Sequence, residues 1–326
     1  MQALSMTNGS MIPRRVSATL AMALILVLTG WVGLTPKASA HLQWQTDIWQ
    51  GFDRCGSMTV SQLQKFWGVS GGTFTQYYTV GVYIGGATAR APSVSCFIPS
   101  ASWVSQVSAI GYGLVFIWDG LQAPCSSNTN RFSSNTTTAY NQGKTEAQAA
   151  YDTVTNLGAD ECCSIEYVDI EGNYTDTTSC HAAINSFLKG WADKLGSLSE
   201  HSGVYSSSSK AIKGLLTDPG KCTSSTGHCP DNVWNAHYVT STDPEYNSVW
   251  SDPNVSDGAW GTYHQRLHQF KNGHSHTFNG ATLNPVDDDC NCGDVAGGSS
   301  HSPVDDGGLS PKQAHPLCNG NGSTHL

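Results

Sequence analysis

Short apolar runs alternate along the chain with longer stretches in which apolar residues recur every three or four positions. Runs of four to eight apolar residues are typical of buried strands, and the three-to-four spacing is typical of amphipathic helices. The expected strands cover residues 47–53, 80–84, 114–118, 165–171, 203–205, 233–237, 265–270 and 282–287. The expected helices cover residues 60–67, 101–110, 145–157, 180–195 and 206–216.

Capping residues mark several of the helix ends. Thr59 or Ser57 precedes the first expected helix as an N-cap, and Gly158 follows the helix at 145–157 as a C-cap. A Ser-, Thr- and Asn-rich segment at 122–142 separates two periodic stretches and is therefore expected to be a loop. The helices after the sixth and seventh strands are expected to be short or missing.

Strands that alternate with helices predict parallel βαβ units. Eight such strands in about 250 residues fit an α/β fold of the (β/α)8 TIM-barrel type, with late helices short or missing. A doubly wound open sheet is the alternative. It is disfavoured because no G-x-G-x-x-G motif follows the first expected strand.

The first forty residues have the pattern of a signal peptide. Arg14 and Arg15 precede a largely apolar run at 18–34, and Ala38-Ser39-Ala40 fits a small-x-small cleavage site. A membrane-anchoring helix is the alternative, but the run is short and broken by glycines. Export by the Sec or the twin-arginine route stays open. The expected organisation is a signal peptide at 1–40, a barrel at 41–292 and a low-complexity tail at 293–326.

Charge and hydropathy narrow the classes of partner. Removing residues 1–40 takes away three basic residues and no acidic residue, so the formal net charge changes from −9 to −12. Clustered lysines and arginines are needed to bind phosphates, and an acidic chain is therefore a poor binder of nucleic acid. No later apolar run is long enough to span a bilayer, so we expect no stable membrane anchor after signal cleavage.

All eleven cysteines follow the expected cleavage site, which indicates an oxidising compartment and disulfides. The odd number leaves at least one thiol unpaired or intermolecular. Cys222 and Cys229 bracket a small polar loop and are the predicted local disulfide. The remaining connectivity cannot be read from the sequence. Cys290 and Cys292 are expected to form disulfides rather than half of a metal site.

The expected strand at 165–171 ends in Asp169 and Glu171. Side chains at positions i and i+2 of a strand point to the same face, so these two carboxylates should project side by side. Active sites of barrel enzymes lie at the C-terminal ends of the strands. Two neighbouring carboxylates suit glycoside hydrolysis, in which one donates a proton and the other stabilises positive charge. A solvated acidic pair at a loop edge is the alternative interpretation.

Other expected strands also end in polar residues. These polar residues are Asp53, Asp119, Tyr205, His237, Gln269 and Asp287, at the ends of the first, third, fifth, sixth, seventh and eighth strands. A single strand-end carboxylate is ordinary. Recurrence over several strands predicts a polar pocket built from several strand ends.

An ordered set of short motifs accompanies these residues. The motifs are Gly51-Phe52-Asp53, Val82-Tyr83-Ile84-Gly85-Gly86, Gly120-Leu121-Gln122-Ala123-Pro124, Tyr167-Val168-Asp169-Ile170-Glu171-Gly172, Gly203-Val204-Tyr205-Ser206-Ser207, Trp234-Asn235-Ala236-His237-Tyr238, and His268-Gln269-Phe270 with Val286-Asp287. Together they resemble the glycoside-hydrolase-like domain of secreted bacterial proteins, formerly a domain of unknown function. That domain is similar to the family 25 glycoside hydrolases, which are N-acetylmuramidases. The resemblance covers nearly all of the chain from 41 to 292.

The resemblance implies roles for the strand-end residues. Glu171 would be the general acid, and Asp169 would polarise the substrate's N-acetyl group or stabilise the oxocarbenium-like charge. Asp53 and Asp287 would tune the pKa of Glu171. The candidate substrate-binding residues are Tyr83, Trp118, Asp119, Tyr205, Trp234, His237 and Gln269. For the four aromatic residues among them, packing in the barrel core is the alternative to sugar stacking.

Two departures from the muramidase pattern bear on the activity. Arg54-Cys55 replaces an aliphatic residue and a serine after the first-strand aspartate, and His268 replaces an aromatic residue. The expected function is a secreted glycoside hydrolase that acts on peptidoglycan or another amino-sugar polymer. The alternative is a non-catalytic barrel that binds cell-wall glycan, so whether the protein is an enzyme, a muramidase-like glycosidase, stays open.

Four late histidines raise the question of a metal: His264, His268, His274 and His276. The first two are four positions apart, but the glutamate of an H-E-x-x-H motif is absent, and a strand at 265–270 would separate them. We therefore expect no metal and no cofactor. The expected partner is a peptidoglycan-type polysaccharide, and the expected location is extracellular or associated with the cell envelope.

Overall fold

The computed structural model describes residues 44–47, 50–67, 77–91, 95–159, 164–172, 174, 177–217, 229–238, 252, 254–255, 259–260 and 265–296. The chain divides into two compact units, Met1–Ser39 and Ala40–Leu326, and all the described residues belong to the second. The expected signal peptide, Cys222, His264 and the expected tail beyond residue 296 lie outside the described residues.

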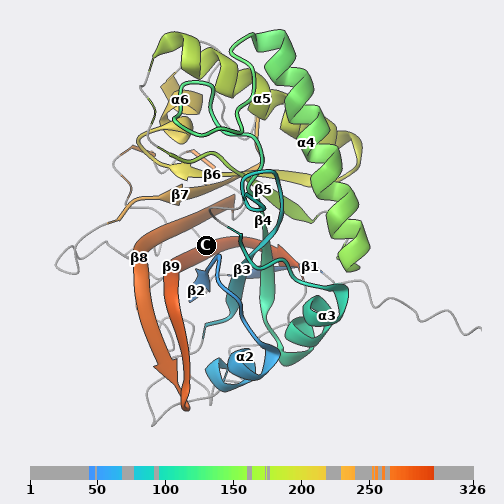
Figure 1. The fold of residues 1–326 in the computed structure, drawn as a ribbon, viewed down its shortest axis with the longest axis vertical. Coiled ribbons are helices and arrows are strands. Elements are labelled where there is room, and N and C mark those ends of the chain that lie inside the picture. The colour runs from blue at the N-terminus through green and yellow to red at the C-terminus, as the bar shows by residue number, and fades with distance from the viewer. Residues whose placement is uncertain are drawn as a thin grey trace, which may run out of the picture. The chain divides into compact units, whose positions relative to one another are not determined.

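Eight strands close into a barrel, which confirms the predicted α/β TIM-barrel fold (Figure 1). They are β2 (Gln50–Asp53), β3 (Thr79–Gly85), β4 (Gly113–Trp118), β5 (Ile165–Asp169), β6 (His201–Ser207), β7 (Asn232–Ala236), β8 (Gln265–Phe278) and β9 (Ala281–Ala296). Strands β2 to β8 pair in parallel with their neighbours in chain order. Strand β9 pairs with both β8 and β2 and closes the ring.

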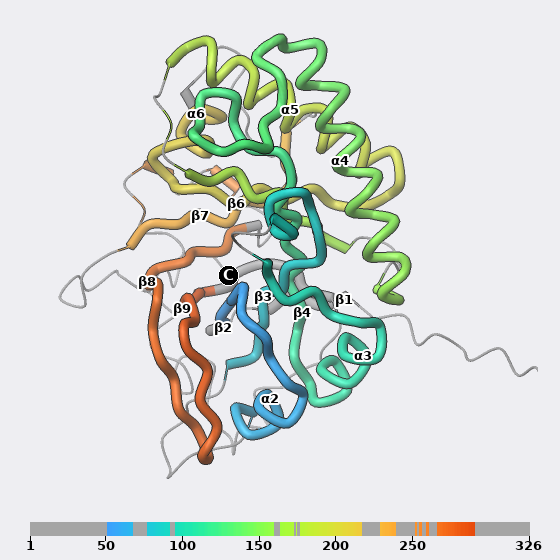
Figure 2. Tube along the Cα trace, in the orientation of Figure 1, coloured from blue at the N-terminus to red at the C-terminus, as the bar shows by residue number. Residues whose placement is uncertain are grey.

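The last barrel strand runs antiparallel to its neighbours, which differs from the expected parallel units. A two-residue turn at Asn279-Gly280 joins β8 to β9, and both turn residues have positive φ. Such turns reverse the chain, whereas a parallel neighbour needs a crossover of a dozen or more residues. Figure 2 shows the two strands side by side up to this turn. The eighth strand is therefore added by a hairpin.

The expected first strand at 47–53 consists of two short strands. Strand β1 (Trp44–Asp47) pairs antiparallel with the end of β9, and β2 begins at Gln50. Only β2 is part of the barrel ring. Because β1 pairs as far as Ala296, β9 continues four residues beyond the predicted end of the barrel at residue 292.

Within the part of the chain that the structure describes, five helices lie outside the strands. They are α2 (Val60–Phe66), α3 (Ala101–Ile110), α4 (Thr136–Leu157), α5 (Thr178–Ser197) and α6 (Ala211–Thr217). Thr59 caps α2 in a capping box with Gln62. Of the two alternatives that the sequence offered for this cap, Thr59 and Ser57, the structure shows Thr59. Helices α4 and α5 run side by side in Figures 1 and 2. Their backbones meet at glycines, since a Cβ on Gly143 would lie 2.0 Å from the Phe187 carbonyl oxygen.

Helix α4 begins at Thr136, within the segment that the sequence predicted to be a loop. The Asn135 side chain caps it by accepting a hydrogen bond from the Thr138 main-chain nitrogen. Its buried face consists mostly of small residues, which suits the close contact with α5. Tertiary packing thus compensates for weak helix propensity in the polar first turns.

Alternation along the strands creates two apolar layers. Tyr167, Trp234 and Leu267 pack in a cluster inside the barrel, whereas Val168 and Val204 belong to the larger cluster that includes residues of the outer helices. The inward face of each strand continues to its C-terminal end. For β5, that inward position after Tyr167 is Asp169.

Two disulfides tie loops of the described chain together. Cys55–Cys96 joins the segments that follow β2 and β3, and Cys125–Cys180 joins the segment after β4 to the first turn of α5. Cys229 and Cys290 are also disulfide-bonded. The pairing of Cys222 with Cys229 stays a prediction. Within the described ranges, no helix is both long and apolar enough to cross a membrane.

Candidate active site

Three aspartates face the barrel interior where β2 meets β9. Asp53 lies opposite Asp287 in the antiparallel register, and directly opposed residues project from the same face of a sheet. Asp289, two positions further along β9, therefore shares that face and lies opposite Gly51 and Gln269. Asp53 and Asp289 are almost fully buried.

Gln269 of β8 connects these aspartates to two tyrosines. Its Nε2 donates to Asp53 Oδ2 at 2.6 Å, and its Oε1 accepts from the hydroxyls of Tyr205 and Tyr238, each at 2.8 Å. Trp234 of β7 donates from Nε1 to Asp289 Oδ1 at 3.0 Å. These contacts fix the buried carboxyl groups in one arrangement.

A second amide fixes the end of β5. The side chain of Gln122 is fully buried and donates from Nε2 to Asp119 Oδ1 at 3.0 Å and to the Asp169 main-chain oxygen at 2.7 Å. Its Oε1 accepts from the Glu171 main-chain nitrogen at 2.7 Å. The segment after β4 thus holds the backbone on both sides of Ile170 and sets the direction of the two carboxyl groups.

Burial and mutual repulsion shift the acidic groups in the same direction. Burial raises the pKa of Asp169 well above its usual value, and the charges of Glu171, Asp119 and Asp53 raise it further. Burial raises the pKa of Asp53, with a further contribution from Asp287. Burial raises the pKa of Asp119 to about 7, and the charge of Glu171 adds to this shift. These carboxyl groups therefore bind protons more tightly than isolated carboxyl groups do.

Glu171 lies at the mouth of this cluster. The residue as a whole is exposed, although nearby protein atoms partly shield its carboxyl group from water. Burial of that group raises its pKa, and the charge of Asp287 acts in the same direction. A hydrogen bond with the Tyr205 hydroxyl opposes the shift. Glu171 is thus an accessible acid whose proton affinity depends on its neighbours.

The structure brings together Asp53, Asp119, Asp169, Glu171 and Asp287, since each of these carboxyl groups either raises the pKa of another or has its own pKa raised by another. One oxygen of Asp169, Oδ1, is buried with no hydrogen-bond partner among the described residues. Buried polar atoms usually have a partner, so a ligand group can take this place.

The predicted aromatic residues fall into two groups. Tyr83, Tyr205 and Trp234 pack with the cluster inside the barrel, beneath the carboxyl groups. Trp118 belongs instead to the outer layer and donates from Nε1 to Glu146 of α4 at 2.7 Å. The structure therefore does not bring Trp118 to the cleft. His237 follows β7, and its main-chain oxygen accepts from His268 Nε2 at 2.9 Å.

A cavity of about 390 Å³ opens beside Glu171. Its wall includes the end of β6 and the residues that follow it, from Ser206 to Lys210, together with His237 and Tyr238 after β7. Tyr238 is the one large apolar side chain of the described chain that is strongly exposed, at 48%. Glu171 belongs both to the wall of this cavity and to the acidic cluster.

Sequence reasoning missed several members of this site, namely Asp289, Gln122, Tyr238 and Lys210. Alternation along a strand from Asp287 would have identified Asp289 as an inward residue. Gln122 lies in a motif already noted, but its role depends on a loop conformation that no local pattern reveals.

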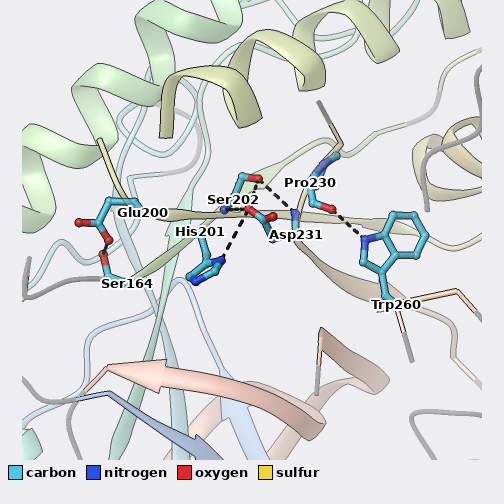
Figure 3. A network of polar contacts seen from close by, with 7 residues as sticks. All are labelled: Ser164, Glu200, His201, Ser202, Pro230, Asp231 and Trp260. Atoms are coloured by element: carbon cyan, nitrogen blue, oxygen red, sulfur yellow. Dashed lines mark hydrogen bonds and ion pairs between the residues drawn. The ribbon is translucent and has the colours of Figure 1, made fainter. Parts of the chain in front are cut away.

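A separate polar network lies at the opposite, N-terminal ends of β5, β6 and β7 (Figure 3). The Ser164 hydroxyl lies 2.7 Å from Glu166 Oε1 and 3.0 Å from Glu200 Oε2. Asp231 Oδ2 accepts from the Ser202 main-chain nitrogen at 2.8 Å and from its hydroxyl at 2.9 Å. Residues at this end of a barrel serve stability rather than catalysis.

The histidines of β8 do not form a metal site in the described chain. His276 Nε2 lies 2.7 Å from Asp288 Oδ1 and 3.1 Å from the Tyr77 hydroxyl. Among the described residues, no group of three or more His, Cys, Asp or Glu side chains is placed to hold a metal ion.

Comparison with known proteins gives one family match. The family described as "Rv2525c-like, glycoside hydrolase-like domain" matches residues 74–291. No curated protein matches the sequence significantly.

Solved structures are similar at low identity. The Tat-secreted protein Rv2525c of Mycobacterium tuberculosis is 13% identical, with 75% of this chain and 96% of that chain covered and a TM-score of 0.47. The spore cortex lytic enzyme SleM of Clostridium perfringens is 13% identical, with 74% and 67% covered and a TM-score of 0.44. An uncharacterized B. stearothermophilus protein is 13% identical, with 74% and 95% covered and a TM-score of 0.44.

Proposed function

This chain belongs to the Rv2525c-like, glycoside hydrolase-like domain family, and from that premise we propose that it hydrolyses peptidoglycan or another amino-sugar polymer. The observation that carries the proposal is the convergence of Asp53, Asp119, Asp169, Glu171 and Asp287 at one end of the barrel. Glycoside hydrolysis needs a protonated carboxyl group and an ionised one within reach of the same bond.

Glu171 is the proposed general acid. A general acid must carry a proton near neutral pH, and burial together with the charge of Asp287 raises the pKa of Glu171 towards that range. Its exposed position lets it reach a glycosidic oxygen in the cleft. Proton transfer from Glu171 to that oxygen lets the bond to the anomeric carbon break as the leaving sugar departs as an alcohol.

Asp169 is the proposed partner of the substrate's acetamido group. Its free Oδ1 can accept a hydrogen bond from the acetamido N–H, which makes the acetamido oxygen a better nucleophile towards the anomeric carbon. Asp169 must be ionised for this step. Because the charge of Glu171 raises the pKa of Asp169, a proton held by Glu171 favours the ionised form of Asp169.

Asp53 and Asp287 support this pair, and the Gln269 amide holds Asp53 in place. Water then attacks the cyclised intermediate at the anomeric carbon, and Glu171 accepts its proton, so the acid is restored. The protein is proposed to act after export, outside the cell or at the cell envelope, with residues 1–40 as its signal peptide. Disulfides Cys55–Cys96 and Cys125–Cys180 support this location, because disulfides persist in oxidising compartments.

One observation favours the alternative of a barrel that binds glycan without cutting it. Asp169 is only 1% exposed, so the acetamido group must enter a narrow opening to reach it. If the opening admits no substrate, the same cleft can still hold a glycan chain across the exposed Glu171 and Tyr238.

The test is release of reducing sugars from purified peptidoglycan and from chitin oligomers. The wild-type protein is compared with the Glu171→Gln variant. Asp152→Asn, at an exposed position of α4, is the control for the loss of a carboxylate. Release by the wild type and the control, reduced about 10²–10⁴-fold in Glu171→Gln, supports a hydrolase. Retention on insoluble glycan with no release by any variant would replace the hydrolase with the binding barrel.

A further inference from the structure

The cavity beside Glu171 is chemically different from the acidic cluster it adjoins. Its volume of about 390 Å³ lies within the usual range for ligand pockets. Three of its walls come from the segments after β5, β6 and β7, which place Glu171, Lys210 and Tyr238 around one space. A ligand that fills this cavity can therefore contact both Glu171 and Lys210.

Lys210 is held at the wall of this cavity. Its Nζ donates to the Tyr174 main-chain oxygen at 3.1 Å and lies 5.2 Å from the centre of the Tyr174 ring. An ammonium group has three N–H donors, so these contacts position Nζ and leave donors for a ligand. No carboxylate of the described residues forms a salt bridge with Lys210.

Serine hydroxyls extend this donor surface. The hydroxyls of Ser207 and Ser209 lie 3.1 Å apart, so whichever one accepts this hydrogen bond keeps its own proton for another acceptor. The Ser208 hydroxyl accepts from Asn254 Nδ2 at 3.1 Å and likewise keeps its proton. A cationic group beside hydroxyl donors suits an oxyanion, because hydrogen bonds to a charged acceptor are the stronger ones.

The charge of the adjoining cluster makes the choice of ligand more specific. Asp53, Asp119, Asp169 and Asp287 would repel an acidic substituent that entered the barrel end. An acidic group that points to Lys210 avoids that repulsion, because none of these four aspartates lines the cavity wall. We propose that this cavity is a subsite for a carboxylate group carried by the glycan, next to the bond that Glu171 faces. This proposal rests on the proposed function and specifies its substrate class.

The experiment measures binding by calorimetry with a Glu171→Gln protein, which removes the proposed acid. The probes have equal length: a neutral N-acetylglucosamine oligomer, an oligomer with lactyl-ether carboxylates, an oligomer with hexuronic acid residues, and the carboxyl-amidated forms of the two acids. The two acidic probes distinguish the two sources of a sugar carboxylate. We expect at least one of them to bind about tenfold more tightly than its amidated form.

Lys210→Met should abolish that preference, whereas Lys210→Arg should retain most of it. Lys213→Met, at an exposed position of α6 three residues after Lys210, is the matched control and should leave all affinities unchanged. Equal affinity for acid and amide in the starting protein, or an unchanged preference in Lys210→Met, would overturn the subsite. Because the readout is binding, the subsite can stand if no bond is cut, and hydrolysis can stand if the subsite fails.

Discussion

A single hydroxyl connects the proposed acid to the buried part of the cluster. The Tyr205 hydroxyl lies 2.8 Å from Gln269 Oε1 and is also within hydrogen-bond reach of Glu171, and sharing its one proton with Glu171 lowers the pKa of that carboxyl group. Gln269 in turn donates to Asp53, so the chain Glu171–Tyr205–Gln269–Asp53 runs from the mouth of the cleft to its buried end. The proton affinity of Glu171 therefore depends on a neutral neighbour as well as on charges.

Tyr205→Phe removes this hydroxyl and keeps the ring that packs on Trp234. The ionised form of Glu171 loses a hydrogen bond, so its pKa should rise. A general acid is active while protonated, and the alkaline limb of the pH profile of kcat/KM should therefore move to higher pH. The profile is measured on the glycan that the wild type cleaves. An alkaline limb that stays in place or moves to lower pH would contradict this role of Tyr205.

Among residues, the sequence predicted those whose position follows from strand alternation. Three aspartates lie at inward strand positions: Asp53, Asp169 and Asp287. Glu171 comes two residues after Asp169. The apolar runs that precede these carboxylates indicated the strands, and therefore the end of the barrel at which the carboxylates meet. Gln122 and Lys210 lie in loops, where the direction of a side chain depends on long-range contacts. Trp118 was a candidate for sugar stacking, with core packing as the alternative, and its alternation with the inward-facing Ile117 directs it to the outer layer.

At the scale of elements, the β8–β9 hairpin carries the largest departure from the expected pattern. Asn279 and Gly280 have φ values of 48° and 74°, as the tightest hairpin turns require. The Asn-Gly pair between two apolar runs is a strong hairpin signal, and it was available in the sequence. It was overlooked because parallel units were expected to continue to the eighth strand. The missed start of α4 has a different origin, since its polar first turns form through tertiary packing.

Gly280→Ala should lower the free energy of unfolding by about 1 kcal/mol, because an alanine at positive φ is strained. The added Cβ meets no atom within 4 Å, so packing does not contribute to the loss. Gly196→Ala is the matched control. It also adds a Cβ with nothing within 4 Å, but inside α5, where alanine should stabilise by about 0.5–1 kcal/mol. Urea unfolding measures both, and changes of the same sign would contradict the turn conformation.

For the whole molecule, the two ends of the barrel hold acidic groups in different surroundings. The C-terminal end is open beside Glu171, whereas at the N-terminal end Glu166 is fully buried beneath the helices. Burial raises the pKa of Glu166 to about 8, the Ser164 hydroxyl opposes the shift, and the charge of Glu200 adds to it. The closed barrel and its polar end could be predicted from regular alternation. The long-range disulfides and the burial of Glu166 could not be predicted, because both depend on which distant segments of the chain come into contact.

Glu166 should make the stability of the whole protein depend on pH. Its folded pKa of about 8 exceeds the ordinary value of 4.5, so the folded state binds the proton more tightly than the unfolded state. Stability should therefore be greatest below pH 4.5 as far as this group is concerned, and should fall by about 1.4 kcal/mol per pH unit as pH rises towards 8.

Glu166→Gln replaces the acid with a neutral amide that can still contact Ser164. The variant should lose less free energy of unfolding than the wild type between pH 5 and pH 9, measured by urea unfolding at each pH. Asp152→Asn, at an exposed position on α4, controls for the change in net charge. An identical pH dependence in Glu166→Gln and the wild type would show that Glu166 is not held protonated.

The central claim is that Glu171 donates the proton that releases the leaving sugar. It is tested most directly by comparing two substrates that share one amino-sugar disaccharide: the natural polymer and a dinitrophenyl glycoside, whose leaving group needs no proton. Glu171→Gln should cleave the polymer about 10²–10⁴-fold more slowly than the wild type and should cleave the dinitrophenyl glycoside at a rate within about tenfold. An equal loss on both substrates, or no loss on the polymer, would contradict the assignment of Glu171 as the acid.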